Sequence, residues 1–308
     1  MMKKKKALLI YNGNAGQKKI EKTLGAAVPI LSQYVDELVI KPTKKETDAE
    51  EFCEQLDEDV NYLFILGGDG TVHSCINGVA GLHKKPAIGI LPGGTCNDIS
   101  RSLQIPQQIE QAAHALTGGE LVSIDLLKTD QQYALNFWGI GLITEASENI
   151  RENEKAVIGK LSYFTSALRT LSRAEPFEVE MLIDGEKIND KAVMLLVLNG
   201  HFIGTNRIPL ANHMMNDGLA DILICRNPSL SAFKELLALD DKSASEFDKD
   251  DLSFYQGKSI EITTKQEMKA DTDGEIYTKT PVKIEVLKGH LQMIVPADSA
   301  IARPSSTD

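Results

Sequence analysis

Two glycine-rich turns are the part of this sequence best suited to chemistry. Residues 64–71 read FILGGDGT, and residues 90–98 read ILPGGTCND. Each is a short apolar run that ends in glycines, with an Asp or Asn just beyond them. Glycine can adopt positive φ and has no side chain, so backbone N–H groups can approach a phosphate closely. One such turn alone is often only a turn, whereas two at equivalent places predict a phosphate site.

Asp69 is the unusual member of the first turn. A carboxylate repels a phosphate unless a metal ion or a transferable proton lies between them, so Asp69 indicates Mg²⁺ or the orientation of an attacking hydroxyl. In the second turn, Thr95 and Asn97 add uncharged polar contacts and Asp98 adds a second carboxylate. A helix predicted to begin at Thr71 would point its positive dipole end at the same place.

The first 120 residues alternate between apolar strands and helices. Strand-like runs occupy 5–13, 35–42, 62–70 and 87–94, and helix-like runs occupy 17–33, 47–59 and 71–82. Strands that are apolar along their whole length predict a parallel sheet covered by helices on both faces. Ligands bind beyond the carboxyl ends of such strands, where both glycine turns fall.

The pattern changes after residue 120. Closely spaced strand candidates follow at 121–128, 133–141, 177–188, 191–200, 219–226, 258–264, 281–289 and 291–296, and helix-like runs interrupt them at 158–173 and 229–239. Several of the strands alternate apolar and polar residues, as half-exposed antiparallel strands do. We therefore predict an α/β domain over 1–120, which residues 297–308 could rejoin, and a mostly antiparallel β domain over 121–296.

Composition excludes several classes of protein. The 308 residues carry a net charge of -11, which argues against coating nucleic acid by bulk charge. No apolar run is long enough to span a membrane. The four cysteines form no CxxC pair and no zinc spacing, so we expect reduced thiols in a cytoplasm. The lysines at 3–6 are typical of a soluble surface, and they could also favour an anionic membrane.

The glycine turns and several shorter motifs together resemble the diacylglycerol kinase family, which includes bacterial lipid kinases and sphingosine kinases and is related to NAD kinases. The resemblance covers nearly the whole chain. Its motifs are Asn12–Gly16, Thr43, GGDGT at 67–71, LPGGTCND at 91–98, GKLSY at 159–163, Asn199-Gly200, Asp217-Gly218-Leu219 and Asp273-Gly274-Glu275.

The resemblance implies a two-domain kinase, with the α/β domain and a β-sandwich on either side of a cleft that holds ATP and a lipid. The γ-phosphoryl group of ATP would pass to a lipid hydroxyl, in a cytoplasmic protein that touches the membrane transiently. ATP would lie on Asn12, Gly13, Asn14, Ala15, Gly16, Thr43, Gly67, Gly68, Asp69, Gly70, Thr71, Gly93, Gly94, Thr95 and Asn97.

The resemblance also implies the catalytic and metal-binding groups. Asp69 would organise the Mg²⁺-phosphate network, and Asp273 or Glu275 would supply the general base. A structural Mg²⁺ would take the Asp217 carboxylate with backbone oxygens near Met214 and Leu219, a ligand set that suits this cation.

The triplet Asp-Gly-Glu is a weak signal by itself because it occurs twice. Asp184-Gly185-Glu186 lies between two strand-like runs, which predicts a type I′ hairpin. Asp273 could be the same feature. Its place near the chain end, within the wider resemblance, favours the catalytic interpretation.

Three departures from the family pattern bear on the acceptor. Ser74 replaces a glutamate usual after GGDGT, Ile143 replaces an acidic residue of a GIGFDA motif, and the first loop lacks its proline. We expect His73, beside Ser74, at the helix surface. Three functions stay open: a lipid kinase, a kinase with a soluble acceptor, and a nucleotide-binding regulatory protein without turnover.

Two further interpretations concern surfaces. The run 158–173 is amphipathic, which is typical of a core-facing helix but also of a lip that touches a membrane. Exposed strand edges in the β-rich domain make a homodimer plausible.

Overall fold

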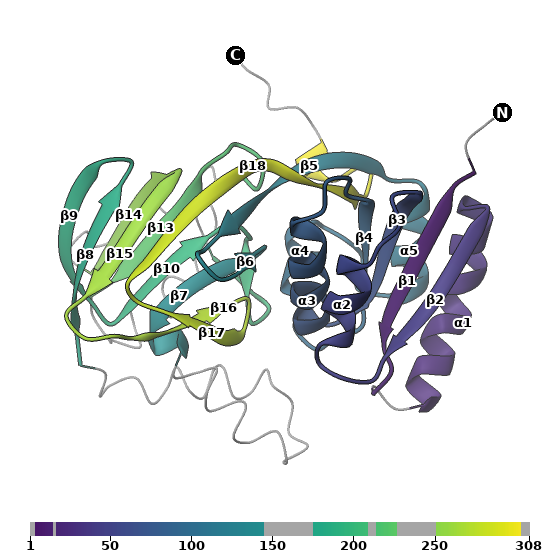
Figure 1. The fold of residues 1–308 in the computed structure, drawn as a ribbon, viewed down its shortest axis with the longest axis horizontal. Helices are drawn as coiled ribbons and strands as arrows, with labels where there is room; N and C mark the ends of the chain where they lie inside the picture. Colours follow the sequence, from purple (N-terminus) through teal and green to yellow (C-terminus); the bar gives the residue numbers. More distant parts are fainter. Residues whose placement is uncertain (1–3, 15–16, 145–174, 209–213, 227–250, 303–308) are drawn as a thin grey trace. The chain divides into compact units, whose positions relative to one another are not determined.

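The computed structural model of the chain describes residues 4–14, 17–144, 175–208, 214–226 and 251–302 (Figure 1). The chain divides into two compact units. The first comprises Met1–Ile124 and Gly289–Asp308, and the second comprises Asp125–Lys288. Among the described residues, no helix is both long and apolar enough to cross a membrane.

The first unit contains a parallel sheet in the order β2-β1-β3-β4. Its strands are β1 (Lys6–Asn12), β2 (Glu37–Thr43), β3 (Val60–Gly67) and β4 (Ala87–Pro92). Its helices are α1 (Gln17–Tyr34), α2 (Asp48–Glu54), α3 (Asp69–Ala80), α4 (Asp98–Ser102) and α5 (Ile109–Thr117). The predicted α/β fold with a parallel sheet is confirmed.

The strand order explains why both faces of this sheet are covered. The chain steps from β1 to β2 in one direction along the sheet, and from β2 through β3 to β4 in the other. Right-handed crossovers therefore place α1 on one face and both α2 and α3 on the other. Accordingly α2 packs against α3, and α1 packs against α5 (Figure 1). The buried strand β4 is apolar along its whole length for this reason.

The second unit contains two antiparallel sheets. One has the order β14-β13-β10-β7-β16-β17, and the other includes β18, β15, β8 and β9. The first comprises β14 (Leu252–Gly257), β13 (Ala220–Cys225), β10 (Met194–Leu198), β7 (Phe137–Gly141), β16 (Lys269–Thr272) and β17 (Glu275–Lys279). The remaining strands of this unit are β6 (Tyr133–Ala134), β8 (Phe177–Ile183), β9 (Glu186–Ala192), β11 (Phe202–Ile203), β12 (Asn206–Arg207) and β15 (Ser259–Thr264). Strands β5 (Glu120–Lys128) and β18 (Val282–Val295) each contain residues of both units, and the 3-10 turn Ala300–Ala302 belongs to the first.

Two apolar clusters cover both faces of the six-stranded sheet. One contains Trp138 and Ile222 together with Met181 and Ile262 of the other sheet, so it is the interior of a β-sandwich. The other cluster includes Leu196 and Leu223, which point the opposite way from the same strands. This double burial explains why β10 and β13 are continuously apolar, whereas β8 alternates as predicted.

The structure corrects three expectations about elements. Helix α3 begins at Asp69 and not at Thr71. The runs 281–289 and 291–296 form one strand, β18, with Gly289 at a positive φ of 58°. Strands β14, β16 and β17 are present although the sequence pattern did not predict them. The helix-like runs 158–173 and 229–239 lie outside the described residues.

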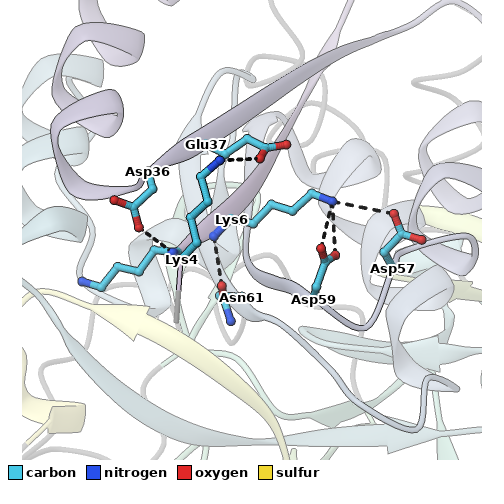
Figure 2. A network of polar contacts seen from close by, with 8 residues as sticks. Lys4, Lys6, Asp36, Glu37, Asp57, Asp59 and Asn61 are labelled. Carbon is cyan, nitrogen blue, oxygen red and sulfur yellow. Dashed lines mark hydrogen bonds and ion pairs between the residues drawn. The ribbon is translucent and has the colours of Figure 1, made fainter. Parts of the chain in front are cut away.

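The basic cluster at the start of β1 is matched by acidic side chains of its own unit (Figure 2). The Lys4 Nζ atom lies 3.2 Å from a Glu37 carboxylate oxygen, and Lys6 Nζ lies 3.2 Å from Asp59 and 3.8 Å from Asp57. The hydrogen bond that Lys6 Nζ donates to the Asp59 carboxylate raises the pKa of Lys6. These pairs lie at the amino ends of the parallel strands, opposite the edge that carries the glycine turns. Because these pairs are largely exposed, membrane contact by the lysines stays a prediction.

Candidate active site

The first loop of the α/β unit packs against the end of β2. The Gly13 N–H donates to the Thr43 carbonyl oxygen at 3.0 Å, and a Cβ on Gly13 would lie 2.4 Å from that oxygen. The Asn14 side chain donates to the Lys44 carbonyl at 3.2 Å. The structure therefore brings Asn12–Asn14 and Thr43 together, as a shared nucleotide site requires. Ala15 and Gly16 lie outside the described residues.

The two glycine turns contact each other backbone to backbone. Gly93 donates its N–H to the Gly67 carbonyl oxygen at 2.8 Å. A Cβ on Gly94 would lie only 2.4 Å from the Gly68 Cα atom. None of the five glycines in the turns (Gly67, Gly68, Gly70, Gly93, Gly94) has a positive φ. Close approach of the two turns, and not positive φ, is therefore what requires glycine here.

Asp69 ties the two turns together. Its Oδ2 atom accepts a hydrogen bond from the Asn97 N–H at 2.8 Å, and its Oδ1 atom accepts one from the Asp98 N–H at 2.7 Å. Removal of the carboxyl group from water raises the pKa of Asp69, although the amides of 97–99 oppose the rise. One carboxylate thus joins the start of α3 to the start of α4.

Asn97 braces the second turn from within. It adopts a left-handed conformation with φ of 54°, which asparagine tolerates better than most residues. Its Oδ1 atom accepts the Gly94 N–H at 2.8 Å, and its Nδ2 atom donates to Gln107 at 3.3 Å. Thr95 is exposed beside it, while Asp98 is buried. The amide of Asn97 therefore shapes the turn, and Thr95 is left exposed beside it.

The helix positions that depart from the family pattern carry no new charge. The Ser74 hydroxyl donates to the Gly70 carbonyl oxygen at 3.1 Å, within its own helix. His73 is buried, so the expectation that it lies at the helix surface is wrong. Its ring nitrogen lies 3.3 Å from the Asn77 amide nitrogen. The Ser74 hydroxyl thus bonds to the backbone of its own helix, at a position where the family usually has a carboxylate.

In the β unit, Asp273 binds the backbone of a distant segment. Its Oδ2 atom accepts the Leu135 N–H at 2.9 Å, and its Oδ1 atom accepts the N–H groups of Asn136 at 2.8 Å and Phe137 at 2.9 Å. Asp273 is 8% exposed. The carboxylate holds the link between β6 and β7 with three hydrogen bonds.

The segment that Asp273 holds binds other motifs in turn. The Asn136 carbonyl oxygen accepts N–H groups from Asn199 and Gly200, both at 2.8 Å. The Asn199 side chain donates to the carbonyl oxygens of Leu135 at 2.8 Å and Asp125 at 3.0 Å. The Asp125 carboxylate accepts the Gly218 N–H at 2.5 Å. We call this set the polar seam: Asp125, Leu135–Phe137, Asn199-Gly200, Gly218 and Asp273.

The polar seam joins three motifs that are far apart in the sequence: Asn199-Gly200, Asp217-Gly218-Leu219 and Asp273-Gly274-Glu275. Glu275 begins β17, directly after the turn that contains Asp273, and is half-buried. The second unit therefore brings these motifs together in space, whereas the sequence shows only their order along the chain.

Comparison with known proteins identifies the chain. A model of the diacylglycerol kinase catalytic domain matches residues 6–129, and a model of the YegS C-terminal NAD kinase beta sandwich-like domain matches residues 140–295. A Staphylococcus aureus strain Newman protein named "Putative lipid kinase" is 36% identical over 296 residues, covering 94% of this chain and 97% of its own. The chain belongs to the diacylglycerol kinase family.

Solved structures agree with this family and with the fold. A protein from Bacillus anthracis described as a "putative diacylglycerol kinase" has 39% identity and a TM-score of 0.86, covering 97% of this chain and 100% of its own. A second structure, described as a diacylglycerol kinase from the same organism, has 35% identity and a TM-score of 0.79, covering 96% and 98%. The predicted family is confirmed, and the two-domain fold class with it.

The loop at Met214, Asp217 and Leu219 is the place where the family resemblance implies a Mg²⁺ ion. Asp217 Oδ1 accepts the Leu219 N–H at 2.9 Å, while the Asp217 carbonyl oxygen accepts a hydrogen bond from Lys288 Nζ at 3.0 Å. Within the described ranges, no three His, Cys, Asp or Glu side chains form a group that could hold a metal. A Mg²⁺ ion at this loop would compete with the Lys288 ammonium group for the Asp217 carbonyl oxygen, and its binding there stays a prediction.

Two polar-seam residues were missed by the sequence reasoning. Asp125 lies in the apolar run VSIDLLK with 0% exposure, and Asn136 lies in YALNFWGIG with 4% exposure. A polar residue inside an otherwise apolar strand was the available signal, because burial demands hydrogen-bond partners for it. The family motif at 159–163 lies outside the described residues.

Proposed function

We propose that this diacylglycerol kinase family member transfers the γ-phosphoryl group of ATP to the hydroxyl of a diacylglycerol-like lipid. The observation that supports it most is the backbone contact between the two glycine turns, which Asp69 ties together. Such a contact requires turns without side chains at the carboxyl edge of β3 and β4, where ligands bind in parallel sheets.

In this proposal the nucleotide lies on Asn12–Gly16, Thr43, Gly67–Thr71 and Gly93–Asn97. The backbone amides and the positive end of the α3 dipole stabilise the negative phosphates. Asp69 keeps the two turns in register, and from that position it organises the phosphate network. Mg²⁺, when bound, neutralises charge on the phosphates, and the loop at Met214, Asp217 and Leu219 would hold a structural ion.

The chemical step needs a proton acceptor for the lipid hydroxyl. We assign this role to Glu275, whose carboxylate takes the proton as the hydroxyl oxygen bonds to the γ-phosphorus. The bond from the γ-phosphorus to the bridging oxygen breaks, and ADP leaves with the electron pair. A positioned general base of this kind contributes about 10²–10⁴-fold to the rate. Positioning of the two reactants supplies most of the rest.

The departures from the family pattern affect the acceptor side. Ile143 is 2% exposed within an apolar cluster, so a carboxylate in its place would be buried without charge compensation. Ser74 also brings no charge. These two substitutions lie outside the phosphate turns. The class of acceptor molecule is therefore the property to test.

The test is transfer of radiolabelled γ-phosphate from ATP, with Mg²⁺, to a panel of acceptors. Diacylglycerol and other lipid alcohols are presented in mixed micelles, and NAD and sugars are presented in buffer. We expect label in the lipid extract only. Label in a soluble acceptor alone would identify a kinase of that type, and nucleotide binding without transfer would identify a regulatory protein. Peripheral membrane contact and a homodimer stay predictions, which liposome co-sedimentation and analytical ultracentrifugation check.

A further inference from the structure

We infer that Asp273 is a positioning residue whose carboxylate fixes the turn presenting Glu275, and that Asp273 is not itself the proton acceptor. This inference rests on the proposed function, which assigns catalysis to the Asp273-Gly274-Glu275 segment. It divides the labour between the two acidic residues of that segment.

Both oxygens of the Asp273 carboxylate are used by the backbone. Three N–H groups, from Leu135, Asn136 and Phe137, donate to it at 2.8 to 2.9 Å. A proton on either oxygen would displace one of these N–H groups and so weaken the contacts that hold the β6–β7 link. A group in this setting is well suited to hold a backbone and poorly suited to accept a proton.

The turn itself depends on Asp273. Asp273 has φ of 55° and Gly274 has φ of 92°, the paired positive values of a type I′ hairpin between β16 and β17. A residue other than glycine at positive φ costs conformational free energy, which contacts with its surroundings must offset. Here two sets of hydrogen bonds stabilise the turn. Three backbone N–H groups donate to the Asp273 carboxylate, and the Gly274 N–H donates to the Asp271 carboxylate at 2.7 Å. Glu275 follows directly, so its position is set by this turn.

The chain contains its own comparison in the other Asp-Gly-Glu triplet. Asp184 and Gly185 have φ of 48° and 91°, and they form the predicted hairpin between β8 and β9. The Asp184 carboxylate likewise accepts backbone N–H groups, from Lys258 at 3.0 Å and Ser259 at 2.9 Å. The same turn and the same use of the aspartate thus occur at a hairpin for which we propose no chemistry. The aspartate is the structural part of the triplet, which leaves the glutamate at 275 for catalysis.

Asparagine at position 273 separates the two roles. It tolerates positive φ and suits a type I′ turn, and its one oxygen can still accept the two N–H groups that Oδ1 receives. It loses the bond to Leu135 and cannot act as a base. Alanine loses all three bonds and the preference for the turn. The conservative variant should therefore rescue a positioning residue and fail to rescue a base.

The experiment compares Asp273→Asn, Asp273→Ala and Glu275→Gln, with Asp184→Asn and Glu186→Gln as matched controls. We expect Asp273→Ala to lower kcat about 10²-fold by misplacing Glu275, with KM for ATP unchanged. We expect Asp273→Asn to recover most of that loss and to keep the acid limb of the kcat/KM pH profile. Glu275→Gln should lose about 10²–10⁴-fold and the acid limb. The two control variants should match the wild type.

Backbone hydrogen exchange at 135–137 provides a readout that needs no activity. We expect faster exchange in Asp273→Ala than in the wild type, and intermediate exchange in Asp273→Asn. An inactive wild type would refute the proposed function. Hydrogen exchange at 135–137 would then still test whether the Asp273 carboxylate holds the β6–β7 link. The inference is overturned if Asp273→Asn is as inactive as Glu275→Gln and lacks the acid limb, or if exchange at 135–137 is unchanged in Asp273→Ala.

Discussion

The Oδ2 atom of Asp69 accepts a hydrogen bond from the backbone N–H of Asn97 at 2.8 Å. This bond connects the start of α3 with the turn that follows β4, so one carboxylate sets the spacing of both phosphate turns. An aspartate that looks purely catalytic in the sequence GGDGT therefore also has a structural task. The consequences can be tested separately from turnover.

Replacing Asp69 by Ala should weaken nucleotide binding as well as remove lipid phosphorylation. The change leaves the amides of Asn97 and Asp98 without their acceptor, which costs about 1–3 kcal/mol for each one that stays buried. Calorimetric titration with Mg²⁺-ATP and urea unfolding measure the two effects. Asp36→Ala is the control, because Asp36 accepts the Lys5 N–H at 2.6 Å at the other end of the strands. Wild-type ATP affinity in Asp69→Ala would contradict the assignment.

Replacing Gly94 by Ala should separate the two glycine turns. The added Cβ would lie 2.4 Å from the Gly68 Cα atom, and backbone atoms cannot rotate away as a side chain can. We expect a lower ATP affinity and a lower Tm. Gly81→Ala is the matched control, since no atom lies within 4 Å of its new Cβ and its φ of -82° suits alanine. Equal ATP binding by the two variants would show that the contact between the turns does not shape the site.

Thiol labelling should report on the phosphate site without any assay of turnover. Of the four free cysteines, Cys53, Cys75 and Cys225 are buried, while Cys96 is partly exposed within the second turn. A hydrogen bond with the Cys53 thiol, together with burial, raises the pKa of Cys75 and makes its thiolate scarcer. We expect a thiol reagent to modify Cys96 first at pH 8, and Mg²⁺-ATP to slow that reaction. First modification of a buried cysteine, or the same Cys96 rate with and without nucleotide, would count against the site.

The ion pair between Asp190 and Arg226 should make stability depend on acid pH. Partial burial is the largest single effect and raises the pKa of Asp190. Hydrogen bonds from Arg226 at 2.6 and 2.8 Å, the bond from the Lys191 N–H at 2.7 Å and the Arg226 charge together outweigh it, so the net shift is downward. A depressed carboxyl pKa stabilises the fold above its unfolded value, near 3.9, and this stabilisation is lost as pH falls below it. Asp190→Asn should lower the free energy of unfolding by about 1–3 kcal/mol at pH 7. The difference from the wild type should shrink between pH 4 and pH 2, and a difference that persists there would refute the linkage.

Local chemistry was predictable from the sequence, and contacts between distant segments were not. The type I′ hairpin at Asp184-Gly185 was predicted because two adjacent residues determine the turn. The glycines at 67–68 and 93–94 were placed correctly at the carboxyl edge of a parallel sheet. The contact that requires these glycines was not predicted, because the requirement comes from one turn packing on the other. Such a contact leaves no trace in either turn alone.

The aspartates show the same limit. Asp273 binds Leu135, which is 138 residues away, so its partners could not be inferred from the triplet around it. Asp125 was missed because a lone acid in an apolar strand does not reveal which amide will satisfy it. The strand β18 was predicted as two runs, because Gly289 resembles an ordinary break until its neighbours on both sides are known.

The most direct test of the account is the initial rate of γ-phosphate transfer from ATP to diacylglycerol in mixed micelles, measured side by side for the wild type and Glu275→Gln. The account predicts labelled lipid from the wild type and a rate about 10²–10⁴-fold lower in the variant, with ATP affinity retained. No labelled lipid from the wild type, or equal rates in the two proteins, would contradict it.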